Sequence, residues 1–176
     1  MIHILPGAFL AAVAALAPVE SLPLACSTHV EQRQLDFLRG DWSFIGSWLG
    51  PDGVMLEVQG ETHVSTELGG CLLLERLRGA TSTAPFQSLS VYSYDPAQKR
   101  FTLVHADSIH GSLLSFNGEA TPDGLSFSTE VRLSRVIMLR QEYRRAGQTI
   151  SVERKRQFGG ETAWTTVWKA TYRRKA

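Results

Sequence analysis

Three residues that lie close together in the chain could carry out acid–base chemistry: His105, Asp107 and His110. Histidine has the side chain whose ordinary pKa lies nearest neutral pH, so it is a common proton donor or acceptor at catalytic sites. A carboxylate two residues away on the same strand face can orient the imidazole ring and fix its tautomer. These three residues are therefore candidate catalytic groups, and a purely structural hydrogen-bonded pair is the alternative.

The segment that carries His105 is expected to be a strand over residues 100–108. Side chains alternate with a period of two along a strand, so Phe101, Leu103, His105 and Asp107 share one face. Phe101 and Leu103 offer more apolar area for burial than the opposite face, which includes the polar Thr102. We therefore expect His105 and Asp107 to point into the protein interior near one end of the fold. The opposite phase, with both side chains in solvent, is the alternative.

The chain offers few metal ligands and no strong catalytic motif. The three histidines His63, His105 and His110 and the carboxylate of Asp107 are the only pool for a metal site, and their convergence depends on strand register. The sequence contains no GxSxG, Walker, GxGxxG, HExxH or CxxC pattern. No histidine follows His110 to serve as a haem ligand on the last strands. We expect neither a metal nor a cofactor.

The rest of the chain is typical of an all-β protein. Short alternating segments are separated by turn residues such as Pro51-Asp52-Gly53, Asp95-Pro96 and Pro122-Asp123-Gly124. One short helix is expected over residues 30–39, ended by Gly40. About nine or ten consecutive antiparallel strands in one domain favour an up-and-down β-barrel, because closure removes exposed strand edges. A two-sheet sandwich is the alternative.

A barrel of this size has room for side chains or for one small ligand. The first hypothesis is therefore a binding protein for a small hydrophobic or amphipathic molecule. The second is an isomerase, cyclase or hydrolase that uses the same cavity, and the third is a structural protein with a filled interior. The expected ligand-binding residues are apolar and mostly aromatic: Trp42, Phe44, Tyr92, Phe101, Leu103, Phe127, Trp164 and Trp168.

Charge is unevenly distributed along the chain. Residues 132–176 hold 12 Lys or Arg against 3 Asp or Glu, whereas residues 1–131 hold 6 against 14, and the net charge of the whole chain is +1. The near-zero total argues against a nucleic-acid-binding protein. Cross-strand pairing between the basic and acidic segments is the favoured interpretation. A basic flank that attracts an anionic ligand or a lipid head group is the alternative.

The N-terminal segment is interpreted as a secretory signal peptide over residues 1–25, followed by a single domain over residues 26–176. Residues 1–19 contain no Lys, Arg, Asp or Glu, and residues 4–17 are almost entirely apolar. A buried helix of the fold is the alternative. We expect an exported, periplasmic or secreted protein, with a membrane as partner only if Cys26 is lipidated in the flawed lipoprotein-like context LPLAC. Otherwise Cys26 and Cys71 form a disulfide or remain thiols.

Several short motifs give the chain a resemblance to a known family. These motifs are residues 35–42 (LxxLxGxW), 60–62 (GET), 68–70 (LGG), 94–101 (YDPAxKxF), 164–165 (WT) and 170–175 (ATYRRK). With them the chain resembles the bacterial lipocalin-like family known as domain of unknown function 1579, over about residues 35–175. The resemblance implies a calycin-type antiparallel barrel. The family has no agreed activity, so the resemblance assigns no functional residue.

Overall fold

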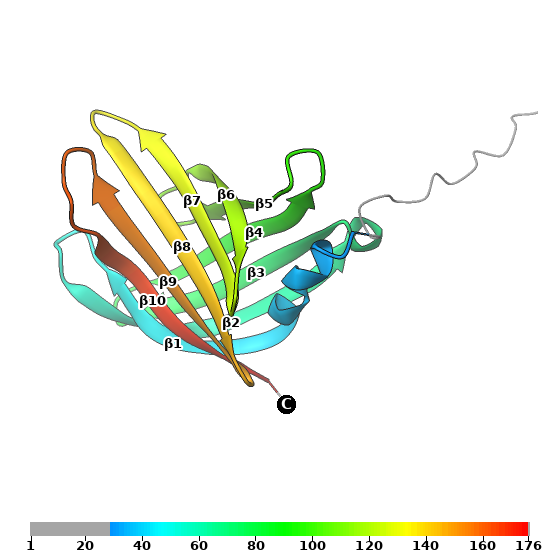
Figure 1. Cartoon of the computed structure of the whole chain (residues 1–176). Helices are drawn as coiled ribbons and strands as arrows, with labels where there is room; N and C mark the ends of the chain where they lie inside the picture. The colour runs from blue at the N-terminus through cyan, green and yellow to red at the C-terminus, as the bar shows by residue number, and fades with distance from the viewer. Residues whose placement is uncertain (1–28, 176) are drawn as a thin grey trace, which may run out of the picture.

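A computed structural model describes residues 29–175 of the chain, and these residues form a closed antiparallel β-barrel (Figure 1). Each strand pairs with its neighbours in sequence, and the last strand pairs with the first. The ten strands are β1 (Gly40–Leu49), β2 (Met55–Glu67), β3 (Leu72–Thr81), β4 (Pro85–Asp95), β5 (Arg100–Asp107), β6 (Leu113–Thr121), β7 (Gly124–Arg132), β8 (Val136–Ala146), β9 (Thr149–Phe158) and β10 (Thr165–Arg174).

The pairing of β1 with both β2 and β10 closes the barrel. Trp42 lies opposite Thr62 on one side and opposite Arg174 on the other, so neither edge of β1 is exposed along this register. The observed topology confirms the expected up-and-down barrel and excludes the two-sheet sandwich.

Alternation along the strands produces an interior filled with apolar side chains. The inward residues of β1, β4 and β9 include Phe44, Tyr92 and Val152, which are buried, while their sequence neighbours face outward. Large buried aromatic side chains dominate this core, as expected for a barrel of ten strands.

A close approach of β2 and β3 requires a glycine at position 60. A Cβ atom added to Gly60 would lie 2.2 Å from the carbonyl oxygen of Arg78 and 2.8 Å from the Phe44 ring. The missing side chain at Gly60 therefore leaves room for the Phe44 ring and for the close approach of β3.

A short helix, η2 (Gln32–Leu38), covers one end of the barrel, here called the closed end (Figure 1). It is a 3-10 helix, tighter than the α-helix and shorter than the segment expected from the sequence. The indole N–H of Trp42 donates to the Leu38 carbonyl oxygen at 2.8 Å, and the Gln32 side-chain oxygen accepts from the Tyr94 backbone N–H at 2.8 Å. Leu35 is fully buried beneath the helix.

The opposite end of the barrel, here called the open end, is formed by the loops at residues 50–54, 82–84, 108–112, 133–135 and 159–164. Within residues 29–175, no helix combines the length and the apolar character that a membrane crossing requires. Residues 1–25 and Cys26 lie outside the described residues, so the interpretations placed on them remain expectations. Cys71, which directly precedes β3, is disulfide-bonded.

Candidate functional site

A cavity of about 350 Å³ lies inside the barrel and reaches the open end. Its apolar wall includes Leu77, Phe86, Leu114, Leu139 and Trp168. The polar groups that border it include Glu75, Ser88, Ser90, His105, Asp107, His110, Gln141, Arg154 and Arg156. The site is thus a mainly apolar chamber with polar groups concentrated in part of its wall.

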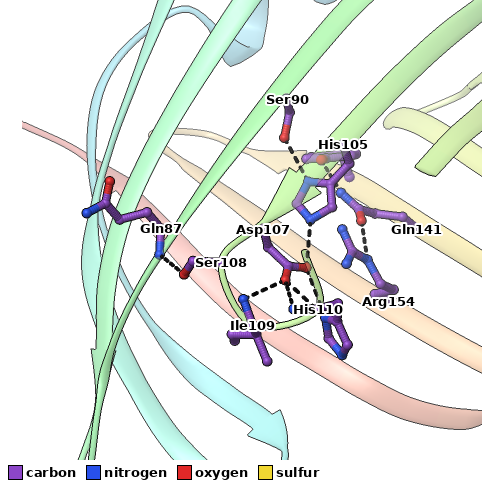
Figure 2. A network of polar contacts seen from close by, with 10 residues as sticks. Gln87, Ser90, His105, Asp107, Ser108, Ile109, His110, Gln141 and Arg154 are labelled. Atoms are coloured by element: carbon purple, nitrogen blue, oxygen red, sulfur yellow. Dashed lines mark hydrogen bonds and ion pairs between the residues drawn. The ribbon is translucent and has the colours of Figure 1, made fainter. Parts of the chain in front are cut away.

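His105 projects from β5 into this cavity, as expected from its position on the same strand face as Phe101 and Leu103. Its side chain is only 9% exposed. Nδ1 lies 3.0 Å from the hydroxyl oxygen of Ser90, its cross-strand neighbour on β4, and Nε2 lies 3.5 Å from Asp107 (Figure 2). Burial lowers the pKa of His105, and the positive charge of Arg154 lowers it further, although Asp107 acts in the opposite direction. His105 is therefore neutral at pH 7.

Asp107 ends β5 and holds the loop that follows. Its carboxylate accepts from the backbone N–H groups of Ile109 at 2.9 Å and His110 at 2.7 Å, and it lies 3.0 Å from His110 Nδ1 (Figure 2). Burial alone would raise the pKa of Asp107. Hydrogen bonds from His105 and His110 outweigh that effect, so the pKa lies far below its usual value and the group is ionised.

A second polar network crosses the barrel interior beneath the cavity. A continuous chain of hydrogen bonds joins Thr62, Glu75, Tyr92, Tyr143, Gln141 and Arg154 in that order. The Tyr92 hydroxyl donates to Glu75 at 2.5 Å and lies 2.8 Å from the Tyr143 hydroxyl. Burial raises the pKa of both tyrosines, so both stay protonated at neutral pH. The network links the packed closed half to the cavity.

The aromatic and apolar residues expected to bind the ligand do not share one location. Of those eight residues, all described, Trp168 alone borders the main cavity. Trp42 and Tyr92 border a separate void of about 10 Å³, which is too small for an organic ligand. Trp164 lies half-buried with its ring 5.0 Å from the Arg140 guanidinium. The remaining four, Phe44, Phe101, Leu103 and Phe127, are buried core residues. The six residues other than Trp164 and Trp168 are buried and fill the interior, so for them the structure supports packing within the fold.

Several polar residues of the site are not among those predicted from the sequence. Ser90, Glu75, Gln141 and Arg154 each face inward because they share a strand face with buried apolar residues. For Arg154, the signal available in the sequence was its period-two spacing from Ile150 and Val152. The charge pattern instead favours cross-strand pairing for the basic residues of this segment, so it does not separate an inward arginine from an outward one.

The two histidines beside Asp107 are expected to titrate in opposite directions from the ordinary value of 6.5. His105 should titrate below 6.5, because burial disfavours its charged form, and His110 above it, because the Asp107 carboxylate favours its charged form. Asp107→Asn should lower the pKa of both rings. The measurement is a pH titration of the ring nitrogens by two-dimensional NMR.

The matched control for this titration is Asp123→Asn, which removes a carboxylate from the turn between β6 and β7 at the other end of the barrel. It should leave both histidine pKa values unchanged. The pKa of Asp107 is lower in the folded protein than its ordinary value of 3.8 in the unfolded chain. Ionised Asp107 therefore stabilises the fold at pH values above 3.8, and this stabilisation is lost as the pH falls below 3.8. Equal pKa values for the two histidines would contradict the assigned network.

Comparison with known proteins places the chain in a family. The model of the family described as "Protein of unknown function (DUF1579)" matches residues 27–174. The chain belongs to this family. No curated protein matches the sequence. The resemblance seen in the sequence motifs is thereby confirmed.

Solved structures similar to this DUF1579 member share its fold at low sequence identity. The crystal structure of Rv2717c from M. tuberculosis has 15% identity and a TM-score of 0.61, over 84% of this chain and 99% of that one. The S-type phycobiliprotein lyase CPES from Guillardia theta has 8% identity and a TM-score of 0.55, over 85% of this chain and 95% of that one.

Within the described residues of this DUF1579 chain, no group of three His, Cys, Asp or Glu side chains is placed to hold a metal ion.

Proposed function

We propose that this protein binds a small amphipathic molecule inside the barrel. The observation that carries the proposal is the cavity of about 350 Å³, bounded by apolar side chains and by one polar region, and reaching the open end. Ligand sites in proteins are typically concave chambers of roughly 300–1,000 Å³ with mainly apolar walls and a few convergent polar groups.

The contrast between the two halves of the barrel supports binding over a purely structural role. Near the closed end, large buried side chains and the hydrogen bond between Tyr92 and Glu75 fill the interior, where a void of about 10 Å³ lies among the described residues. A structural barrel gains from packing its whole interior to this density, because unfilled space costs stability. The space left at the open end is best explained by a ligand.

The proposal is tested by titration with 1-anilinonaphthalene-8-sulfonate, a small fluorescent molecule with an apolar body and an anionic group. Trp48 and Trp168 border the cavity, so their emission should be quenched by energy transfer to a probe bound there. We expect saturable binding at one site with a dissociation constant in roughly the micromolar range. Absence of saturable binding, with the fold intact by circular dichroism, would contradict the proposal.

A second candidate function, hydrolysis of an ester or a similar acyl compound, is favoured by one specific observation. Ser90, His105 and Asp107 lie in a line on the cavity wall, with His105 Nδ1 3.0 Å from the Ser90 hydroxyl oxygen and Nε2 3.5 Å from the Asp107 carboxylate. With Nε2 of His105 donating to Asp107, Nδ1 can accept the Ser90 proton while the Ser90 oxygen attacks a carbonyl carbon. His105 would then return the proton to the leaving group, and water would release the acyl group from Ser90.

Hydrolysis of p-nitrophenyl esters with short acyl chains tests this second candidate. Ser90→Ala should abolish turnover above the background rate, whereas Ser88→Ala should leave it unchanged. Ser88 is the matched control because it borders the same cavity from the same strand face. Turnover that survives in Ser90→Ala would exclude Ser90 as nucleophile, and no turnover in the unmodified protein would exclude this reaction for these substrates.

We also propose that the protein is exported, with residues 1–25 removed as a signal peptide. The disulfide-bonded state of Cys71 supports this proposal, because structural disulfides persist mainly in oxidising compartments. N-terminal sequencing of the protein from fractionated cells should give a mature start between residues 18 and 27. An intact residue 1–17 segment in the isolated protein would contradict it.

A further inference from the structure

Two arginines on one strand face of β9 border the barrel cavity. Arg154 and Arg156 are two residues apart and follow the buried Ile150 and Val152, so their side chains start on the inward face of the strand. Lys155, between them, starts on the outward face, where its ammonium group lies 3.1 Å from Glu153. The two guanidinium groups are therefore directed toward the cavity, unlike the lysine that separates them.

The donors of these arginines are only partly used. Arg154 Nε donates to the side-chain oxygen of Gln141 at 2.5 Å, and its guanidinium carbon lies 5.9 Å from the Phe116 ring centroid. Arg156 Nε is shielded from solvent and has no hydrogen-bond partner. Throughout residues 29–175, no ion pair joins either guanidinium to a carboxylate. A shielded donor without an acceptor is costly, so Arg156 calls for an acceptor from outside the chain.

The carboxyl groups that border the same cavity are engaged elsewhere. Glu75 accepts from Thr62 at 3.1 Å and from Tyr92 at 2.5 Å. Asp107 is held by His105, His110 and backbone N–H groups of its own loop. Neither carboxylate forms an ion pair with Arg154 or Arg156 in the described part of the chain.

We propose that Arg154 and Arg156 form a subsite for the oxyanion head group of the ligand, a carboxylate or a phosphate. The inference rests on the proposed function and specifies the chemical class of the molecule bound. Arginine presents its N–H donors in a planar fork that matches both head groups and binds them through paired hydrogen bonds. The hydrocarbon part of such a molecule would lie against the apolar wall that includes Leu114, Leu139 and Trp168.

Titration of the unmodified protein with three molecules of equal chain length tests the subsite. Decanoate and decyl phosphate carry an oxyanion head group, and 1-decanol carries a neutral one. Binding is measured by isothermal titration calorimetry below the critical micelle concentration of each ligand. At least one of the two anions should bind about tenfold or more tightly than decanol, as charge-assisted hydrogen bonds to arginine require. The tighter of the two anions identifies the head group as carboxylate or phosphate.

Substitutions in β9 test whether the preference for an anionic head group depends on the two arginines. Arg154→Met and Arg156→Met should each weaken binding of the preferred anion about tenfold while leaving the affinity for decanol unchanged. Lys155→Met is the matched control, because it removes the same charge from the outward face of the same strand, and it should change neither affinity. The comparison on the unmodified protein stands even if an arginine variant fails to fold.

The outcomes separate the subsite from the proposed function. Decanol that binds as tightly as both anions would overturn the oxyanion subsite while leaving interior binding in place. Anion binding by both Arg154→Met and Arg156→Met that is as strong as in the unmodified protein would also overturn it. If none of the three molecules binds, both the subsite and the proposed binding of an amphipathic chain are overturned.

Discussion

Replacing Leu35 by alanine is expected to lower the free energy of unfolding by about 2–5 kcal/mol, the range for removing a fully buried leucine side chain. Leu35 is 0% exposed and belongs to η2, which covers the closed end. The short 3-10 helix contributes little stability of its own, so its position depends on the side chains it buries. Loss of Leu35 removes apolar burial and leaves a space that the surrounding barrel cannot fully close.

The measurement is equilibrium unfolding in urea, compared with that of Leu113→Ala. Leu113 is 73% exposed at the start of β6, so the same truncation there should change the stability by less than about 0.5 kcal/mol. Similar midpoints for the two variants would show that η2 is not part of the cooperative barrel fold. Circular dichroism before unfolding confirms that both variants retain the strands.

Replacing Leu139 by tryptophan is expected to weaken probe binding more than about tenfold, because the larger ring occupies space that the ligand needs. Leu139 lies on β8, is half-buried and borders the cavity. The added atoms enter existing space, so this change should cost less stability than overpacking a filled core. Binding of 1-anilinonaphthalene-8-sulfonate is measured as for the unmodified protein.

The matched control is Ile45→Trp, in which an aliphatic residue that is 61% exposed on β1 becomes the same aromatic residue. This variant should bind the probe with unchanged affinity. If both variants bind as the unmodified protein does, the probe occupies the outer surface and the cavity is not its site. A loss in both variants would point to a general effect of the added tryptophan.

Much of the fold could be predicted from the sequence, because period-two alternation and turn residues are local signals. The phase of β5 followed from the apolar area of Phe101 and Leu103, and it placed His105 and Asp107 inside the barrel as observed. Closure of the barrel followed from the number of consecutive strands. These features depend on neighbours in the chain or on a simple count.

The composition of the site was harder to predict, because it depends on which strands face one another across the barrel. Ser90 meets His105 only through the register of β4 and β5, and Arg154 meets Gln141 through that of β9 and β8. Aromatic side chains such as Phe127 are equally suited to a ligand wall and to a packed core, and residue type alone does not separate the two. The catalytic roles first considered for His105, Asp107 and His110 stay a prediction.

The central claim is that the barrel cavity holds a small amphipathic molecule. Its most direct test is native mass spectrometry of the protein purified from its own host. We expect one small molecule to be retained per chain and released under denaturing conditions. It should carry an oxyanion group and be absent from Leu139→Trp prepared in the same way. A protein that has only the mass of its own chain under native conditions would contradict the account. So would a molecule that Leu139→Trp retains to the same extent as the unmodified protein.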